Sequence, residues 1–223
     1  MRKKPPKGSV RRAQPIGNNY RFFFDSKTGE DCQSESFMER VHALKQERDP
    51  RVIRYVSQPE TFNFINKKGK KRHYTPDYRV WMEDGHVEVH EVTLEERRQK
   101  ESSQQREAAG EKICAERGEI YRVFNEEETN RTEAVNLYTF YGYSARCRCD
   151  QRVYDTLLVE MEPGVKYKVR DVAKGIATQL GVLPGVVVAT IAHMIWHQKL
   201  NTDMKILFFL DGEPNKDAVV WRE

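Results

Sequence analysis

The sequence predicts an α/β domain with a mixed sheet flanked by helices, followed by a small α+β domain. Two observations predict the first domain: short strand-like runs between about residues 52 and 92, and a long charged helix that leads into another strand. A third observation predicts the second domain, because three helical segments and then two short strands follow Asp150. At 223 residues, the chain has room for one large domain or two small ones.

The first domain, placed at residues 19–125, is predicted from changes of hydrophobic period. Its expected elements are, in order, a strand at Tyr20–Phe24, a helix between Ser36 and Asp49, strands at Val52–Val56, Thr61–Ile65, Arg72–Met82 and Val87–Val92, a helix at Leu94–Glu116 and a strand at Glu119–Phe124. In the second helix, Ala108, Ala109 and Ile113 are expected on the side that contacts the sheet. Phe37, Val41 and Leu44 recur at i, i+4 and i+7, so we expect them on one face of the first helix. Asp84-Gly85 predicts a tight turn between antiparallel strands.

The second domain, at residues 150–223, follows a connector at residues 126–149. Its expected elements are helices at Gln151–Met161, Val169–Leu180 and Pro184–Leu200, and strands at Ile206–Leu210 and Ala218–Trp221 around Asp211-Gly212. Three helices followed by a hairpin is the order of a winged helix, so we predict a winged-helix-like α+β domain.

The composition is polar for a globular protein, with 38% hydrophobic and 32% charged residues. The most apolar run, Val186–Trp196, is shorter than the ~18 residues that a membrane helix needs. No apolar segment follows the basic N-terminus, so we expect no secretory signal. We therefore expect a soluble, cytoplasmic protein whose cysteines (Cys32, Cys114, Cys147 and Cys149) are free thiols.

The net charge of +4 is concentrated in a basic arm at residues 1–18. The arm has six basic residues and no acidic residue, whereas the rest of the chain has 32 basic and 34 acidic residues. With Pro5, Pro6 and Gly8 the arm cannot bury a core, so we expect it to be disordered when free. Two interpretations stay open: an arm that becomes ordered on DNA phosphates, or a solvated tail.

Two carboxylates are predicted to meet at the ends of neighbouring strands. Asp77 begins one strand of a hairpin and Glu91 lies near the end of its partner, and antiparallel pairing brings those ends together. Carboxylates so placed can share Mg²⁺, which prefers oxygen ligands and polarises a phosphate for attack by water. The pair alone is a weak pattern, because Pro-Asp is also common in turns and an exposed Glu on a strand is usually solvated.

Several ordered motifs make the pattern more specific. They are Ser36-Phe37-Met38-Glu39-Arg40, Arg51-Val52-Ile53-Arg54-Tyr55-Val56-Ser57-Gln58-Pro59, Lys71-Arg72-His73-Tyr74-Thr75-Pro76-Asp77-Tyr78, Glu91-Val92 and Gly118-Glu119-Ile120-Tyr121-Arg122-Val123. Over residues 34–124 the chain thus resembles the catalytic domain of TnsA, the endonuclease subunit of heteromeric transposases. The resemblance implies a restriction-endonuclease-like fold of the PD-(D/E)xK class. It also implies Glu39, Asp77 and Glu91 as catalytic and metal-binding carboxylates, with Mg²⁺ as the cofactor and Mn²⁺ as a substitute.

Two positions of this site carry alternatives. Ser36-x-x-Glu39 is also a capping box, in which the Glu satisfies N–H groups at the start of its helix. Where the family has its catalytic Lys, this chain has Thr93, which carries no charge. Three interpretations follow. A basic residue such as Lys100 or Lys112 reaches in from the next helix, or the enzyme works more slowly with metal alone, or cleavage is lost while DNA binding remains.

A basic cluster between two predicted strands supplies the candidate DNA contacts. Its members are Lys67, Lys68, Lys70, Lys71, Arg72 and His73. Phosphate contacts by such residues give affinity rather than sequence readout, and the alternative interpretation is a solvated hairpin tip. On the neighbouring strand, His90 points to the opposite face from Glu91, so we expect it to be structural.

The second domain is predicted to dock proteins rather than to read DNA. Residues 150–223 hold nine basic and ten acidic residues, whereas a DNA-reading helix is usually basic. The third helix is apolar on nearly every side, which indicates burial by its own domain or by a partner. The TnsA resemblance implies that this region meets the transposase or its ATPase regulator.

The sequence therefore predicts a metal-dependent endonuclease subunit that acts on double-stranded DNA at transposon ends. By its resemblance to TnsA, it would cut the non-transferred strand beside a DDE-type partner transposase. Two alternatives stay open: a catalytically impaired subunit that binds DNA and supports assembly, and a free-standing nuclease of the same fold.

Overall fold

The computed structural model describes residues 22–223 apart from positions 26, 28, 30, 129, 146 and 147. The predicted basic arm at residues 1–18 and the first residues of the predicted strand at Tyr20–Phe24 lie outside the described part. The chain divides into two compact units, Met1–Glu128 and Thr129–Glu223. Each unit has its own sheet and its own helices, and each is described by itself.

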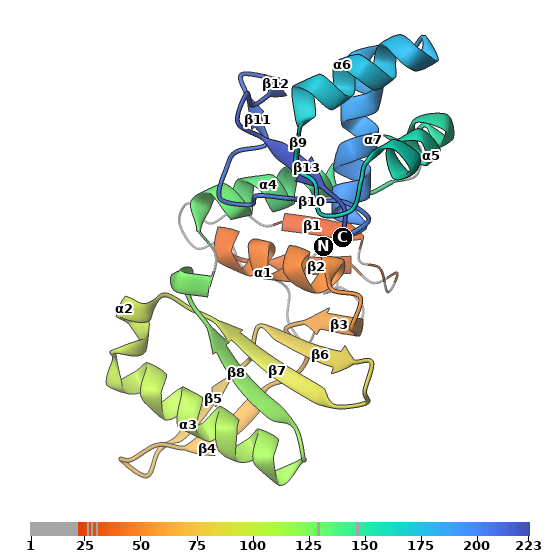
Figure 1. Cartoon of the computed structure of the whole chain (residues 1–223). Helices are drawn as coiled ribbons and strands as arrows, with labels where there is room; N and C mark the ends of the chain where they lie inside the picture. The colour runs from red at the N-terminus through yellow and green to blue at the C-terminus, as the bar shows by residue number, and fades with distance from the viewer. Residues whose placement is uncertain (1–21, 26, 28, 30, 129, 146–147) are drawn as a thin grey trace, which may run out of the picture. The chain divides into compact units, whose positions relative to one another are not determined.

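A four-stranded mixed sheet forms the centre of the first unit (Figure 1). The strands and helices of this unit are β1 (Phe22–Asp25), β2 (Asp31–Ser34), α1 (Phe37–Arg48), β3 (Val52–Ser57), β4 (Phe62–Ile65), β5 (Lys71–Tyr74), β6 (Tyr78–Met82), β7 (Val87–Val92), α2 (Glu95–Arg98), α3 (Glu101–Glu116) and β8 (Ile120–Phe124). The sheet has the order β3-β6-β7-β8, with β7 and β8 parallel and the other pairs antiparallel. The predicted α/β class with a mixed sheet flanked by helices, as in restriction-endonuclease-like folds, is confirmed.

The two faces of this sheet are covered by different elements. Helix α1 lies on one face, and α3 with the β4–β5 hairpin lies on the other (Figure 1). The α3 side buries a core of Phe62, Tyr74, Val89 and Cys114. Because side chains alternate along a strand, consecutive residues of β7 face different helices, and this alternation decides which of them can reach a site.

Two predicted elements are each divided in the structure. The strand expected at Arg72–Met82 is two strands in different sheets, because Pro76 has no N–H to continue a ladder. The helix expected at Leu94–Glu116 is divided into α2 and α3, and Lys100 between them is extended. No apolar residue occurs from Glu95 to Glu107, so a continuous helix would have no face to bury there. Strand β2 was not predicted.

The buried faces of the two helices also differ from expectation. Val41 and Leu44 are buried as predicted, but Phe37 is 50% exposed because packing covers the middle of α1 and not its first turn. In α3 the fully buried residues are Ser103, Gly110 and Cys114. Of the three apolar residues expected on its contact side, Ile113 packs against the core as predicted, Ala109 is half-buried and Ala108 is exposed. The face of α3 that meets the sheet has small residues because the helix lies close to Tyr74 and Tyr121.

The second unit has four helices and two small sheets among its described residues. Its elements are α4 (Arg131–Tyr141), α5 (Gln151–Glu160), β9 (Tyr167–Lys168), α6 (Val169–Leu180), α7 (Pro184–Trp196), β10 (Asn201–Thr202), β11 (Phe209–Leu210), β12 (Glu213–Pro214) and β13 (Val219–Trp221). The three helices expected after Asp150 are confirmed, with α7 ending four residues earlier than predicted. The winged-helix assignment itself stays a prediction.

The strand pairing predicted for the second unit is wrong. The expected hairpin joined Ile206–Leu210 to Ala218–Trp221, but β11 pairs with β12 and β13 pairs with β9 and β10. Asp211 and Gly212, between β11 and β12, both have the positive φ of a tight two-residue turn. The segment before β11 is no strand, because its backbone bonds to a side chain: Asn136 donates to the carbonyl of Ile206 (2.8 Å) and accepts from the N–H of Phe208 (2.9 Å).

Helix α7 is almost entirely buried, and it packs against α4, α5 and α6 of its own unit. Among the described residues, no single helix is long and apolar enough to cross a membrane; α6 and α7 pass that test only as a pair, bent by 120°. Cys32, Cys114 and Cys149 are free thiols as predicted, and Cys147 lies outside the described part.

The close approach of α3 to the sheet gives a test of the packing. A Cβ at Gly110 would overlap the Tyr74 hydroxyl and the Tyr121 ring. We expect Gly110→Ala to lower the free energy of unfolding by about 1–3 kcal/mol, measured by chemical denaturation.

The matched control is Gly175→Ala in the interior of α6, where an added Cβ meets nothing within 4 Å. There the greater helix propensity of Ala should stabilise the protein by about 0.5–1 kcal/mol. Equal effects of the two substitutions would contradict the packing of α3 on the tyrosines.

Candidate active site

Asp77 is fixed at the point where β6 begins beside the end of β7. Its N–H donates to the carbonyl of His90 (3.1 Å), and its Oδ2 accepts the N–H of Val92 (2.7 Å). These two partners are the residues on either side of Glu91 in β7. The structure therefore brings Asp77 and Glu91 to adjacent strand ends, in the arrangement that antiparallel pairing predicts.

Gln58 supports the same strand end from β3. It is buried with a positive φ of 50°, and its N–H donates to the carbonyl of Asp77 (2.7 Å). Its side chain accepts from the amide of Gln33 in β2 (2.9 Å). A non-glycine residue in this backbone region is uncommon and persists only where its surroundings fix it. The Gln-Pro turn thus holds the carboxylate-bearing segment in place.

Glu91 is half-buried and lies close to two tyrosines of the α3 side. Burial raises the pKa of Tyr121 well above its ordinary value, and the charge of Glu91 raises it further. Burial also raises the pKa of Tyr74, again with a contribution from Glu91. Both phenols therefore stay protonated and can act only as neutral polar groups beside this carboxylate.

Glu39 has the capping role that the sequence offered as one alternative. Its N–H donates to Ser36 Oγ (3.1 Å), and its own Oε2 accepts the N–H of Glu35 (2.7 Å). Its backbone carbonyl accepts a hydrogen bond from the hydroxyl of Tyr78 (3.0 Å). Tyr78 follows Asp77 directly, and its pKa is raised mainly by burial, with contributions from the charges of Glu39 and Asp77. The first turn of α1 thus approaches the strand end through Tyr78.

The three predicted carboxylates are not gathered into one ligand group. Within the part of the chain that the structure describes, no three His, Cys, Asp or Glu side chains are placed to hold a metal ion together. Asp77 and Glu91 nevertheless have the chemistry that Mg²⁺ needs, because this ion commonly uses one or two carboxylates and completes its shell with waters and phosphate oxygens. The oxygen donors at the β6–β7 end therefore fit Mg²⁺, whereas Glu39 is engaged at its helix terminus.

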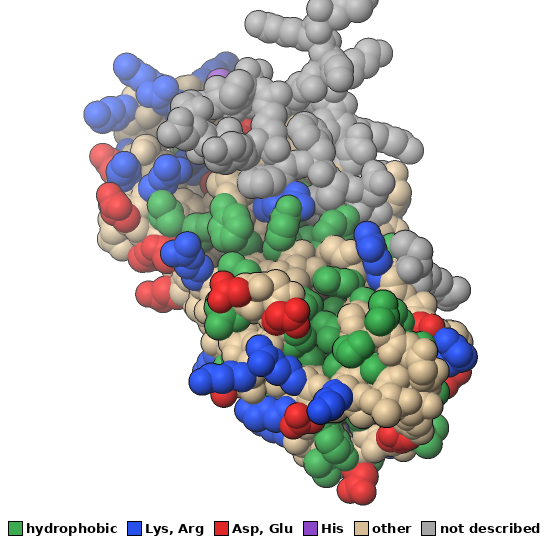
Figure 2. Space-filling view, turned by 90° about the horizontal axis from the view of Figure 1, so that it is seen from above, with side chains coloured by type: hydrophobic (Ala, Val, Ile, Leu, Met, Phe, Trp, Pro, Cys, Tyr) green, Lys and Arg blue, Asp and Glu red, His purple; other side chains and the backbone are tan. Residues whose placement is uncertain are grey.

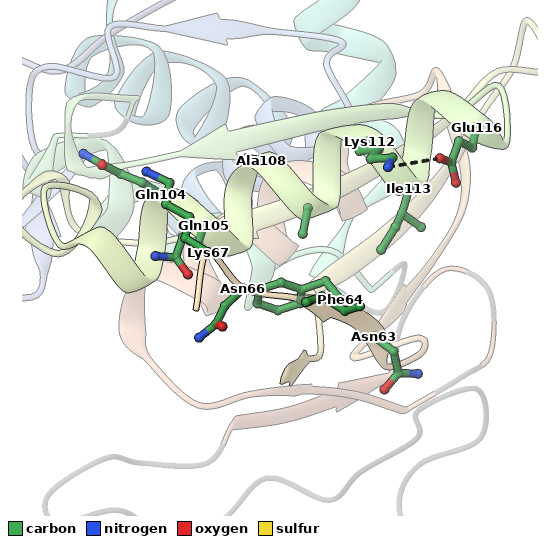
Figure 3. Close-up of a pocket in the computed structure, with 12 residues that line it drawn as sticks. Asn63, Phe64, Asn66, Lys67, Gln104, Gln105, Ala108, Lys112, Ile113 and Glu116 are labelled. Carbon is green, nitrogen blue, oxygen red and sulfur yellow. Dashed lines mark ion pairs between the residues drawn. The ribbon is translucent and has the colours of Figure 1, made fainter. Parts of the chain in front are cut away.

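All six predicted DNA contacts are exposed on the β4–β5 hairpin. Three of them, Lys68, Arg72 and His73, line a pocket of about 450 Å³ together with Arg106 of α3. A second pocket, of about 680 Å³, lies between β4 and the exposed side of α3 (Figure 3). Basic and amide side chains thus surround the junction between hairpin and helix.

Both lysines suggested as replacements for the family Lys are exposed. Lys112 is 78% exposed and points along α3 towards Glu116, 4.0 Å away (Figure 3). Lys100 is exposed at the residue before α3. Thr93 is half-buried just after β7, and its N–H donates to the carbonyl of Phe124 (2.9 Å).

Comparison with known families supports the assignment of this region. Residues 49–126 match the family model described as TnsA-like endonuclease N terminal. Over these residues the chain is similar to the N-terminal domain of TnsA-like endonucleases. The match covers about a third of the chain and includes Asp77 and Glu91, but not Glu39 or the second unit. No curated protein matches the chain.

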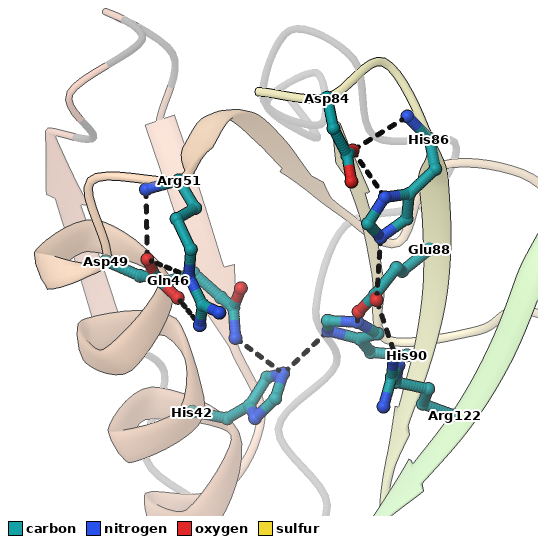
Figure 4. A network of polar contacts seen from close by, with 9 residues as sticks. All are labelled: His42, Gln46, Asp49, Arg51, Asp84, His86, Glu88, His90 and Arg122. Atoms are coloured by element: carbon teal, nitrogen blue, oxygen red, sulfur yellow. Dashed lines mark hydrogen bonds and ion pairs between the residues drawn. The ribbon is translucent and has the colours of Figure 1, made fainter. Parts of the chain in front are cut away.

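The first unit also contains a buried polar network that the sequence did not reveal (Figure 4). His90 contacts His42 of α1 through Nδ1 (2.9 Å) and Glu88 through Nε2 (2.7 Å). Glu88 also pairs with His86 (3.0 Å) and Arg122 (2.9 Å). These contacts are satisfied when both buried imidazoles carry their proton on Nε2. The network lies on the α1 face of β7, so His90 is structural and points away from Glu91, as predicted.

Charge in this network makes the domain sensitive to acid. Hydrogen bonding from His90, aided by His86 and Arg122, lowers the pKa of the Glu88 carboxyl from 4.5 to about 2. Burial lowers the pKa of His42 and of His90 below the ordinary 6.5, so the folded state resists their protonation. A carboxyl with a depressed pKa stabilises the fold above its unfolded pKa and loses that contribution as the pH falls towards its folded pKa.

We expect Glu88→Gln to lower the free energy of unfolding by about 1–3 kcal/mol at neutral pH, because His90 and Arg122 lose a charged acceptor. The variant should also lose part of the pH dependence of stability between pH 4.5 and about 2, the interval between the two pKa values of Glu88. Denaturation curves at several pH values measure both effects. Glu83→Gln, at an exposed position nearby, is the control, and an equal effect there would contradict the network's role.

Proposed function

We propose that this chain is a metal-dependent DNA endonuclease subunit that cleaves a phosphodiester bond at transposon ends. One observation carries the proposal. Within a TnsA-like endonuclease domain, Asp77 is fixed by the backbone of β7 directly beside Glu91, at the ends of two adjacent strands. Two carboxylates side by side at strand ends offer the oxygen donors that Mg²⁺ commonly uses.

Asp77 and Glu91 would hold the ion, with Mg²⁺ as the natural cofactor, Mn²⁺ as a substitute and Glu39 as a candidate third ligand. When bound, the ion would polarise the scissile phosphate and increase the acidity of an attacking water. Asp77 keeps its orientation because Val92 donates to one of its oxygens. The basic residues of the β4–β5 hairpin would bind the DNA backbone, and the strand would be hydrolysed without a covalent intermediate on the protein.

The partners follow from the TnsA-like domain and from the second unit. We propose that the chain cuts the non-transferred strand beside a DDE-type transposase. The second unit would dock on that transposase or on its ATPase regulator. In Figure 2, hydrophobic side chains lie among charges of both signs on the face of the molecule seen from above, rather than in a uniformly basic surface. Val159, Leu183 and Leu210 are exposed apolar residues of this unit.

The presence of Thr93 at the family's Lys position favours one rival function. A subunit that binds DNA and supports assembly, but no longer cleaves, would keep this fold and its basic hairpin. A free-standing nuclease is a second rival, and cleavage without any partner transposase would support it. Both rivals are distinguished from the proposed function by the same cleavage assay.

We expect the chain, with its partner transposase and Mg²⁺ or Mn²⁺, to nick supercoiled plasmid that carries transposon ends. Asp77→Asn and Glu91→Gln should each lower the nicking rate by at least about a hundredfold, since even groups that only orient metal ligands are worth 10–100-fold. Glu111→Gln, an exposed carboxylate of α3, should leave the rate unchanged. Equal nicking by wild type and Asp77→Asn would exclude the enzymatic function.

Substitution can distinguish a metal-binding role of Glu39 from its helix-capping role. Gln can replace Glu in a capping box, so Glu39→Gln should preserve the stability of α1 while it removes the charge. If Glu39 binds metal, as we propose, this variant nicks at least about tenfold more slowly and shows a thermal unfolding curve like that of wild type. Wild-type nicking by Glu39→Gln, with destabilisation by Glu39→Ala, would leave Glu39 with the capping role alone.

A further inference from the structure

We propose that Arg106 of α3 supplies the positive charge that this site lacks at Thr93, by binding the scissile phosphate beside Glu91. The inference rests on the proposed endonuclease function and names a residue that the sequence motifs do not include. Three structural observations lead to it: the geometry of the β7–α3–β8 crossover, the two charges near the Tyr74 hydroxyl, and the surroundings of the Arg106 side chain.

The crossover fixes which part of α3 lies over Glu91. β7 and β8 are parallel, with Val89 opposite Tyr121 and Glu91 opposite Val123. The connecting helix must therefore run back along the strands, so its first turns lie over the carboxyl ends of β7 and β8. Gly110 marks one point of contact, because it lies directly against Tyr121.

From the contact at Gly110, four residues back along α3 cover about the same distance as two residues forward along β7. Glu91 lies two residues beyond Val89, or about 6.6 Å along a strand. Arg106 lies four residues before Gly110, or about 6 Å along a helix and on nearly the same face. Gly110 lies against Tyr121, the β8 partner of Val89, and the equal advance of helix and strand then places Arg106 near Glu91.

The charges near the Tyr74 hydroxyl agree with this placement. This hydroxyl also lies against Gly110. Burial raises the pKa of Tyr74; Glu91 adds to the increase, and Arg106 opposes it. The charges of Glu91 and Arg106 thus act on the same phenol with opposite sign, which agrees with their placement at one end of the crossover.

The surroundings of Arg106 leave its guanidinium able to meet DNA. The side chain is half-buried and donates to Ser103 Oγ (3.2 Å) one turn earlier. It lines the same pocket as Lys68, Arg72 and His73 of the basic hairpin. A phosphate bound along that hairpin would therefore meet Arg106 within the same pocket.

The chemistry of arginine suits this task. A guanidinium donates two parallel hydrogen bonds to phosphate oxygens and keeps its charge at any pH at which the protein is folded. It would stabilise the charge that develops on the phosphoryl group, and it would transfer no proton. Thr93 can offer a hydroxyl but no charge. The positive group would thus come from the helix rather than from the strand.

The test combines removal of Arg106 with restoration of a lysine at the strand. Single-turnover nicking by the full chain, with its partner transposase and Mn²⁺, is measured for Arg106→Ala, Arg106→Gln and Thr93→Lys/Arg106→Ala. We expect the two single variants to nick roughly 10²–10³-fold more slowly, the loss typical of one charge-stabilising donor. Their affinity for DNA should change only a few-fold, because one phosphate contact is lost. The double variant should recover at least about tenfold, since Thr93→Lys places an ammonium where the family has one.

Lys112→Ala, on the exposed side of the same helix, is the matched control and should nick like wild type. Wild-type nicking by Arg106→Ala would overturn the inference, as would a rate loss that matches a loss of DNA affinity or of thermal stability. If Asp77→Asn abolishes nicking while Arg106→Ala does not, only this inference fails. If the wild-type chain itself does not nick, the proposed function fails together with it.

Discussion

The pairing of β6 with β7 is the constraint on which the rest of the candidate site depends. At one end of this strand pair, the Asp77 N–H donates to the carbonyl of His90 and the Val92 N–H donates to the Asp77 carboxylate. That bond fixes the orientation of the half-buried Asp77 carboxylate. Gln58 supports the same position from β3, with a backbone conformation that non-glycine residues rarely adopt. A carboxylate held in this way is prepared for a ligand before the ligand binds.

Because side chains alternate along β7, the polar residues that stabilise the domain lie on one face of the strand and the candidate active-site carboxylate lies on the other. Glu88 and His90 face α1 and form a closed polar network with His42, in which each buried group has a charged or polar partner. Val89 and Glu91 face α3, where Val89 joins the apolar core and Glu91 lies near two tyrosines. Neighbouring residues of one strand therefore have different roles, and a shift of register by one residue would exchange them.

Charge is distributed across elements rather than along one motif. The carboxylates come from strand ends, the exposed lysines come from a hairpin in a separate sheet, and Arg106 comes from the crossover helix. Such an arrangement allows a basic group to move from strand to helix without loss of the fold, provided that the helix stays close to the sheet. Gly110 makes that close approach possible, because any larger residue would meet Tyr74 and Tyr121.

The sequence by itself determined the order of the main helices and of the central strands, the positions of Asp77 and Glu91 at neighbouring strand ends, and the exposure of the basic hairpin. These features follow from local period and turn chemistry, which act over a few residues. Only the tertiary structure decided that Pro76 divides one predicted strand between two sheets, that Glu39 caps its helix, and that Arg106 lines a pocket with the basic hairpin while Lys112 pairs with Glu116. Each of these depends on how distant segments pack, and a helix of charged residues such as α3 has no apolar stripe from which its orientation could be predicted.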